Sequence, residues 1–476
     1  MSDREICFLT ATELSRLVRA RELSAGEVLE AHFSQIDRLN PKVNAIVTLV
    51  ADRARERARA ADQALAAGNA VGPLHGLPIA HKDLVWTRGI RTTFGTLACK
   101  DFVPTRDALI VERLKQAGAV TIGKTNTPEF GAGSQTFNPV FGETRNPYDT
   151  SKTCGGSSGG AAVALACGMQ PLADGSDTGG SLRNPANFCN VVGLRPSPGR
   201  VPIWPSQAGW YTIGVQGPMA RTVRDAALML SAIAGPDRRS PISIAEAGSR
   251  FAAPLERDFR ECRIAWSPTL GGLPVDRRVT RVLAGQRQVF ESLGCRVEES
   301  TPDFKEAEVV FRAWRAWRFE LTLSALNPGQ QSRLKDTLKQ EIEAAGKLSA
   351  IDLSRAELRR TRLYHRVREF METHEFLICP VNQVPPFDVK QPYVEEINGV
   401  RMKTYIDWMQ SCWTISVLGL PAISVPAGFT PEGLPVGIQI VGRHQDDWGV
   451  LQLAHAYEQA TGFWKRRPPL CSDGAG

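Results

Sequence analysis

Two glycine-rich segments of the 476-residue chain carry serines of a kind that enzymes use as nucleophiles. The first, CGGSSGGAAVALACG at residues 154–168, holds Ser157 and Ser158 between pairs of glycines and then turns apolar. The second, DGSDTGGSLRNP, places Ser181 directly after a Thr-Gly-Gly tripeptide. A serine hydroxyl in such a loop can attack a carbonyl carbon once a base takes its proton. These residue types therefore suggest acyl transfer through a covalent serine intermediate.

The first segment also admits three other interpretations. Gly-Ser loops serve as turns and flexible connectors. A glycine-rich loop before a helix can cradle phosphate, although no G-K-[ST] follows in this loop. Residues 155–159 match G-x-S-x-G, the nucleophile elbow of α/β-hydrolases, but turn-forming residues precede them where that elbow requires an apolar strand. An esterase of that type with Ser157 as nucleophile stays open, because four histidines follow it: His365, His374, His444 and His455.

A backbone nest in the second segment can hold a developing oxyanion. Its two glycines let the chain fold tightly, so that consecutive N–H groups converge on one point. Removing one such donor typically raises the activation barrier by roughly 3 kcal/mol. The predicted donors are the backbone N–H groups of Thr178, Gly179, Gly180 and Ser181.

Lys82, in the run LPIAHKDLVW, is the candidate base. If this run is a strand, His81 and Asp83 share one face and Lys82 lies on the other. A lysine that faces a sheet interior loses hydration, which lowers its pKa. For half of the amine to be neutral at pH 7, the pKa must fall by about three, which corresponds to destabilising the charged form by roughly 4 kcal/mol relative to the neutral form. A neutral Lys82 could then take a proton from Ser157, which takes one from Ser181. Without the serine segments, a solvated edge lysine would be the simpler interpretation.

Helix signals dominate the front of the chain. Capping boxes begin helices at Thr10 and at Ser24. The second helix is expected to reach about Leu39, before Asn40-Pro41, and a third to stop at Gly68. We therefore expect a helical section over residues 9–68.

From Gly72 onward, short apolar runs alternate with amphipathic helices, which predicts an α/β fold with a large mixed sheet. Strand-like runs return near the end of the chain, and no linker separates domains. We expect one domain over residues 1–476 with these sections: a catalytic core at 72–235, a variable, mostly helical substrate-side section at 240–415, and strands and a helix at 416–465 that complete the sheet.

Composition excludes several classes of protein. The net charge of +7 is a mild excess without a long basic block, so no nucleic-acid partner is expected. The ten cysteines form no C-x-x-C and no zinc-like spacing, which favours a reducing compartment and no metal. No run approaches a membrane span, and no signal peptide is apparent. We expect a cytoplasmic protein without a membrane contact.

Taken together, the motifs resemble the amidase signature family. The resemblance is carried by GLPIAHKDLVWTRG, KTNTPEFGAGSQTFNPVFGETRNPYD, CGGSSGGAAVALACG and DTGGSLRNPANFCNVVGLRPSPGRVP, and it spans nearly the whole chain, most weakly over 240–400. It implies a twisted mixed sheet covered by helices on both sides. It also implies amide hydrolysis without a cofactor.

The resemblance assigns a role to each motif residue. It implies that Ser181 is the nucleophile, that Ser157 is a bridging serine held by a cis peptide bond, and that Lys82 is the general base. The four N–H groups of residues 178–181 become the oxyanion hole. Ser158 would support the first loop by hydrogen bonds around the triad. Asp177 and Arg183 would hold the nest rigid, either as a charge pair or as backbone anchors.

The substrate prediction is less direct. By the resemblance, the GAGS stretch should lie beside the acyl-binding cleft, and a Trp-Tyr pair in a later loop could reach it: Gly131, Ala132, Gly133, Ser134, Trp210 and Tyr211. Other aromatic side chains of the variable section could also reach the cleft: Trp314, Trp317, Trp408 and Trp413. This aromatic surplus, and the lack of a clear acid-binding arginine cluster, favour a neutral aryl or alkyl amide or anilide, with ester or carbamate side activity.

Two further functions stay open. Within the family, the chain could be the glutaminase (A) subunit of a tRNA-dependent amidotransferase. From a different class, it could be a non-catalytic protein that grips anions with its glycine loops. Many family members dimerise, so the resemblance also suggests a homodimer.

Overall fold

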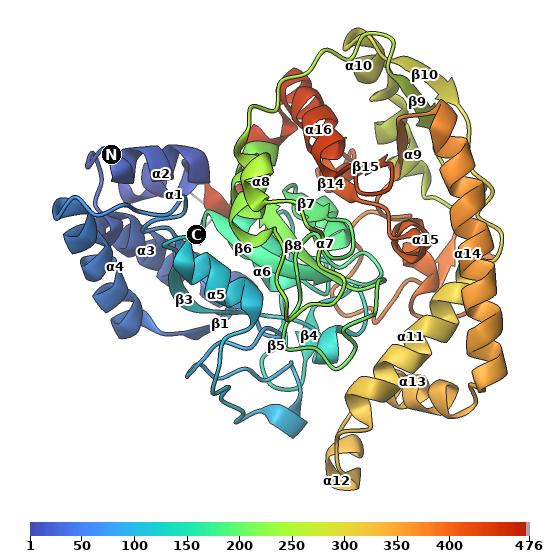
Figure 1. Cartoon of the computed structure of the whole chain (residues 1–476), viewed down its shortest axis with the longest axis horizontal. Coiled ribbons are helices and arrows are strands. Elements are labelled where there is room, and N and C mark those ends of the chain that lie inside the picture. Colours follow the sequence, from blue (N-terminus) through green and yellow to red (C-terminus); the bar gives the residue numbers. More distant parts are fainter. Residues whose placement is uncertain (473–476) are drawn as a thin grey trace.

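An eight-stranded mixed sheet runs through the molecule (Figure 1), in a computed structural model that describes residues 1–472. The strand order is β10-β9-β11-β15-β14-β7-β8-β6. Strand β9 pairs in parallel with β10 and β11, and the other neighbours are antiparallel. The strands are β6 Leu172–Asp177, β7 Val192–Arg195, β8 Val215–Ala220, β9 Arg263–Trp266, β10 Arg296–Glu299, β11 Phe376–Pro380, β14 Ala422–Phe429 and β15 Pro435–Gly442. The predicted α/β class with a mixed sheet is confirmed.

Helices cover both faces of this sheet, as the alternation of side chains along β14 shows. Ile423 and Val425 pack in one apolar cluster with Leu451 of α16, whereas Ala422 packs in another with Trp413 of α15. The helices around the central strands are α5 Leu109–Gln116, α6 Gly159–Ala166, α7 Arg183–Phe188, α8 Val223–Ile233, α15 Gln410–Leu418 and α16 Asp447–Thr461.

A smaller three-stranded sheet brings the candidate base to the large one. Its order is β1-β3-β2, with β2 parallel and β1 antiparallel to β3. Strand β2 packs beside β6, and the Nδ1 atom of His81 lies 2.8 Å from Asp174 Oδ1 across this junction. The strands are β1 Ile46–Leu49, β2 Pro78–Lys82 and β3 Val120–Thr125, and two-stranded ribbons join β4 Phe137–Asn138 to β5 Gly142–Glu143 and β12 Glu396–Ile397 to β13 Val400–Arg401.

The front section matches its helix signals but is not all helical. Both capping boxes are present, and the helices are α1 Asp3–Phe8, α2 Ala11–Arg19, α3 Ala25–Val43 and α4 Ala51–Ala66. Helix α3 passes through Pro41 instead of ending near Leu39. Asn40 Oδ1 accepts hydrogen bonds from the backbone of Ala45 and Ile46, and Asn44 takes the left-handed conformation that ends the helix. Strand β1 follows directly.

The section at 240–415 is largely helical, but it also supplies three strands of the large sheet, β9, β10 and β11. These strands are four or five residues long and carry little sequence pattern. In Figure 1, α14 runs along one side of the molecule and α11 to α13 project below it. The helices are α9 Arg277–Ala284, α10 Arg287–Ser292, α11 Ala307–Leu323, α12 Pro328–Gln331, α13 Asp336–Gly346 and α14 Ala350–Thr373.

Short 3₁₀ turns complete the fold at Leu97–Cys99, Glu129–Gly131, Gly248–Ala252, Asp407–Met409, Phe463–Lys465 and Pro469–Cys471. Across residues 1–472, none of the helices combines the length and the apolarity that crossing a bilayer requires.

Candidate active site

Lys82 is the last residue of β2 and is completely buried. Its Nζ atom lies 2.8 Å from Ser157 Oγ, 2.9 Å from Ser158 Oγ and 3.1 Å from Ser176 Oγ. The structure thus brings the candidate base into direct contact with the first serine segment. Lys82 and the first serine segment also contact Ser176 of β6, the strand that leads into the second serine segment.

Burial gives this lysine an unusual pKa. Loss of hydration lowers the pKa of Lys82 to about 7, and the carboxylates of Asp174 and Asp177 only partly oppose the shift. About half of the amines are therefore neutral at pH 7. The ring of His81 contacts Asp174 and Thr121, whereas Asp83 lies beyond the end of β2 and accepts hydrogen bonds from Thr93.

The loop of Ser157 is fixed by close contacts. The Gly156–Ser157 peptide bond is cis, as the family resemblance implies. The backbone N–H of Gly156 donates to Asn184 Oδ1 at 3.1 Å. At Gly155, with φ +76°, a Cβ would lie 2.4 Å from the same oxygen, so only glycine fits this turn without displacing Asn184.

The nest at Ser181 differs from its prediction at one position. The Asp177 carboxylate accepts the backbone N–H of Gly180 at 2.9 Å and that of Leu182 at 3.2 Å. Gly180 is therefore occupied and does not serve as an oxyanion donor in this conformation. Of the four predicted donors, Thr178, Gly179 and Ser181 remain.

A buried ion cluster holds the nest in place. Arg183 Nη2 and Arg195 Nη1 lie 3.0 and 3.1 Å from Asp177 Oδ1, and all three side chains are fully buried. Burial alone would raise the pKa of Asp177, but the two guanidinium groups hold it well below its ordinary value. Asp177 and Arg183 thus form the expected charge pair, and Arg195 is a member that sequence reasoning missed.

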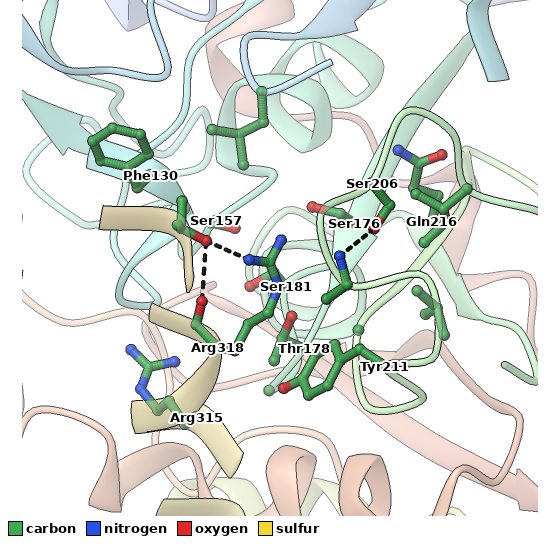
Figure 2. A pocket seen from close by; sticks show the side chains of 18 of the residues that line it. Phe130, Ser157, Ser176, Thr178, Ser181, Ser206, Tyr211, Gln216, Arg315 and Arg318 are labelled. Atoms are coloured by element: carbon green, nitrogen blue, oxygen red, sulfur yellow. Dashed lines mark hydrogen bonds between the residues drawn. The ribbon is translucent and has the colours of Figure 1, made fainter. Parts of the chain in front are cut away.

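Ser157, Ser176, Thr178, Gly179 and Ser181 all line one pocket of about 290 Å³. Figure 2 shows Ser157, Ser176 and Ser181 with Arg315 and Arg318, which come from α11. Among the described residues, no hydrogen bond joins Ser157 to Ser181. Lys82 contacts Ser157, and Ser181, the predicted nucleophile, lines the same pocket as Ser157.

Half of the predicted substrate-binding residues line the pocket. Gly131, Gly133 and Tyr211 do so. The other three do not: Ala132 is buried away from the pocket, Ser134 donates to Met409 Sδ at 2.7 Å, and Trp210 is 77% exposed. Neighbouring residues in these loops point in opposite directions, so a contiguous stretch contributes only some of its members.

The tryptophans of the variable section belong to the packing and not to the pocket wall. Trp413 stacks on Phe311 with ring centres 5.0 Å apart, and Trp408 on Phe188 at 6.2 Å. Trp314 and Trp317 contact each other edge to face. The aromatic wall is formed instead by Phe94, Phe130 and Phe319, which the sequence did not single out.

Sequence reasoning also missed Ser176, Arg315 and Arg318. No spacing in the sequence points to Ser176, because its contact with Lys82 depends on β6 lying beside β2. The arginines are three residues apart on α11 and so share one helix face. The expectation of a neutral substrate rested partly on the lack of a clear acid-binding arginine cluster in the sequence, whereas two arginines line the pocket in the structure.

Comparisons with known proteins agree with this geometry. Residues 27–451 match the model of the amidase family. The chain is 36% identical to the acylamidase of Rhodococcus erythropolis over 98% of both chains. It is 35% identical to the A subunit of the glutamyl-tRNA(Gln) amidotransferase from Geobacillus kaustophilus, over 97% of this chain and 99% of that protein.

Solved structures of other proteins have a similar fold. The crystal structure of a bacterial aryl acylamidase of the amidase signature enzymes superposes with a TM-score of 0.92 and 30% sequence identity, over 98% of this chain and 99% of that one. The structure of 6-aminohexanoate cyclic dimer hydrolase superposes with a TM-score of 0.87 at 26% identity, over 98% and 99%.

Proposed function

Because the chain belongs to the amidase signature family and is a hydrolase of amide carbon–nitrogen bonds, we propose that Ser181 is its nucleophile. In this proposal Ser157 is the bridging hydroxyl and Lys82 the general base. The observation that carries it is the 2.8 Å contact between Lys82 Nζ and Ser157 Oγ, at the edge of the pocket that contains Ser181.

The proposed reaction proceeds through an acyl-enzyme. Neutral Lys82 takes the Ser157 proton as Ser157 takes that of Ser181, and the Ser181 oxygen bonds to the carbonyl carbon. The backbone N–H groups that remain in the nest stabilise the oxyanion. The proton then returns through Ser157 to the amide nitrogen, the carbon–nitrogen bond breaks, and the amine leaves. Water, deprotonated by the same relay, releases the acid. A side-chain rotation that joins Ser157 to Ser181 accompanies substrate binding.

The proposed substrate is an aryl or alkyl amide or anilide. The apolar wall supports this: Phe94 and Phe130 stack with ring centres 5.9 Å apart, and Phe319 lies on the same pocket. Apolar pocket walls with a few polar groups bind such ligands by excluding water. Esters and carbamates that reach the same acyl-enzyme are proposed side substrates.

The glutaminase function is the second candidate, because the curated relatives include amidotransferase A subunits at 35% identity. Both candidates share the proposed triad. An α/β-hydrolase mechanism is disfavoured, since Ser157 contacts a lysine and no histidine is among the described residues that line the pocket. A non-catalytic binding role does not agree with the family assignment.

We also propose that the enzyme acts in the cytoplasm, as a homodimer, without nucleic acid. Free thiols support the reducing compartment: all ten cysteines lie in the described part of the chain and are unpaired. Light scattering of the purified chain tests the dimer.

Labelling with a fluorophosphonate, followed by peptide mapping, tests the assignment of the nucleophile. The adduct is expected on Ser181 in the wild type and is expected to be absent from Ser181→Ala. An adduct on Ser157 would overturn the assignment. In parallel, hydrolysis of 4-nitroacetanilide and of glutamine by the purified chain separates the two candidate functions: turnover of glutamine alone would favour the amidotransferase function.

A further inference from the structure

We propose that the amide substrate carries a carboxylate and that Arg318 binds it. This inference rests on the proposed function and narrows its substrate class. It concerns the wall of the pocket formed by α11, opposite the reacting serines.

The pocket is positively charged. Its described lining includes two ionised side chains, Arg315 and Arg318, and no aspartate or glutamate. Charge of one sign in a cleft with apolar walls favours a ligand of the opposite sign. The two arginines are not equivalent, because only one of them has a counter-ion.

Arg315 is neutralised within the protein. Its Nε atom lies 2.8 Å from Glu341 Oε1, and Nη2 donates to the Tyr405 hydroxyl at 2.6 Å, which in turn donates to Glu341. Its guanidinium also lies over the ring of Phe319, 4.7 Å from the ring centre. These contacts join α11 to α13 and satisfy the charge of Arg315, so we assign it a structural role.

Arg318 has no such counter-ion. It forms no ion pair with any carboxylate of the described residues, and its one hydrogen bond from the guanidinium runs from Nη1 to Thr322 Oγ1, one turn further along the same helix. A guanidinium has five N–H donors, so most of them are left for a ligand. Burial lowers the pKa of Arg318. Unpaired charge in such a place is costly unless an anion pairs with it.

Tyr211 supplies a second, independent indication. Its hydroxyl oxygen is buried and has no hydrogen-bond partner among the described residues. Burial raises the pKa of Tyr211 to about 12, so the hydroxyl is a neutral donor at pH 7, and it lies within the field of Arg318. Figure 2 shows Arg318 extending toward the serines, with Tyr211 beside Thr178. Buried hydroxyl groups are rarely left without a partner.

A carboxylate fits these two groups better than other anions do. Its two oxygens match the planar fork of a guanidinium, and either oxygen can also accept from a phenol. It is ionised at the pH where Lys82 is neutral, so recognition and catalysis are compatible. The aromatic wall formed by Phe94, Phe130 and Phe319 would hold the apolar part of the same molecule.

Matched substrates test the inference on both sides of the scissile bond. One pair is succinyl 4-nitroanilide and its neutral isostere 4-methylpentanoyl 4-nitroanilide, with the carboxylate on the acyl part. The other is 4-acetamidobenzoate and 4-methylacetanilide, with the carboxylate on the amine part. We expect wild-type kcat/KM to favour the acid over its neutral partner by at least about tenfold in one pair. Arg318→Gln should lose this preference, because its kcat/KM should fall much further for the acid than for the neutral partner.

Further variants separate recognition from folding. Arg312→Gln, on the same helix but outside the pocket lining, is the matched control and should keep the preference. Tyr211→Phe should reduce it, and Arg318→Lys should retain part of it. Equal rates for acid and neutral partner in both pairs, or an equal loss on both in Arg318→Gln, would overturn the inference.

A binding measurement distinguishes this inference from the proposed function. 3-Phenylpropionate should raise the melting temperature of the wild type more than 3-phenylpropanol does, and this difference should vanish in Arg318→Gln. If the neutral anilides are hydrolysed but this difference is absent, only the present inference fails. If binding discriminates but no amide is cleaved, the proposed function fails instead.

Discussion

Lys82 gains its proposed role from the three hydroxyl groups around its nitrogen. A neutral amine has two N–H donors and one lone pair, so among Ser157, Ser158 and Ser176 one hydroxyl must donate to it and two must accept. Ser157 and Ser176 both line the pocket of Ser181, and Ser157 Oγ is the nearer of these two to Nζ, at 2.8 Å against 3.1 Å. In the proposed relay, the lone pair is directed to Ser157.

The pH dependence of catalysis follows from this lysine. Burial lowers the pKa of Lys82 to about 7, and only the neutral amine can accept a proton. We expect kcat/KM for 4-nitroacetanilide to rise with pH through about 7 and to level off above it. Initial rates from pH 5 to 9 measure this, with melting temperatures recorded at each pH as a control. A rate that is flat across this range would contradict the assignment.

At this scale, residue types and spacing pointed to Lys82, Ser181 and the Ser157–Ser158 pair, while the family resemblance chose Ser157 over Ser158 and assigned the order of the three residues. The contact with Ser176 was not predictable from spacing, because it depends on β6 lying beside β2 in space. Nor was the occupation of Gly180 predictable: it follows from the direction in which the Asp177 side chain turns back on its own loop.

At the scale of elements, the segment from β6 through the nest to α7 depends on Asp177. This carboxylate accepts two backbone N–H groups of the nest and pairs with Arg183 and Arg195, so it links β6, α7 and β7. Removing its charge leaves two buried guanidinium groups without a counter-ion.

We expect Asp177→Asn to lower the free energy of unfolding by about 3–5 kcal/mol, as the loss of one partner of a buried ion pair typically does. Urea unfolding followed by fluorescence measures the change. The matched control is Asp258→Asn, which removes an exposed partner of Arg260 and should leave the unfolding midpoint in place. If both variants unfold at the same urea concentration, the cluster does not stabilise the nest as described.

Elements with strong local signals were predictable, and short ones were not. Capping boxes located the starts of α2 and α3, and apolar runs located β14 and β15. By contrast, β1, β9 and the edge strand β10 have four residues each, which is too few for a period to show. Their pairing is decided by neighbouring strands that are distant in sequence.

At the scale of the whole molecule, the site is assembled from sections far apart along the chain. The small sheet supplies Lys82, the large sheet supplies Ser176 and the nest, and the variable section supplies α11 with its arginines. The motif-bearing sections could be recognised from sequence alone. The contribution of α11 could not, because its residues reach the pocket only through the packing of a section that carries no motif.

Catalysis is expected to be independent of metal ions. The proposed relay activates Ser181 with an amine and a hydroxyl, and residues 1–472 contain no group of three or more His, Cys, Asp and Glu side chains placed to hold a metal ion. Dialysis against EDTA should leave kcat/KM unchanged, with a mock dialysis as the control. Loss of activity that a divalent cation restores would show that the relay is incomplete.

The most direct test of the account is amide hydrolysis by Lys82→Ala at pH 7. Removing a general base typically costs 10²–10⁴-fold, so we expect kcat/KM for 4-nitroacetanilide to fall by at least about 10²-fold. The comparison is made with protein whose circular dichroism and melting temperature show that it remains folded. A folded Lys82→Ala that hydrolyses the anilide at the wild-type rate would contradict the central claim that a buried, neutral lysine activates the serine nucleophile.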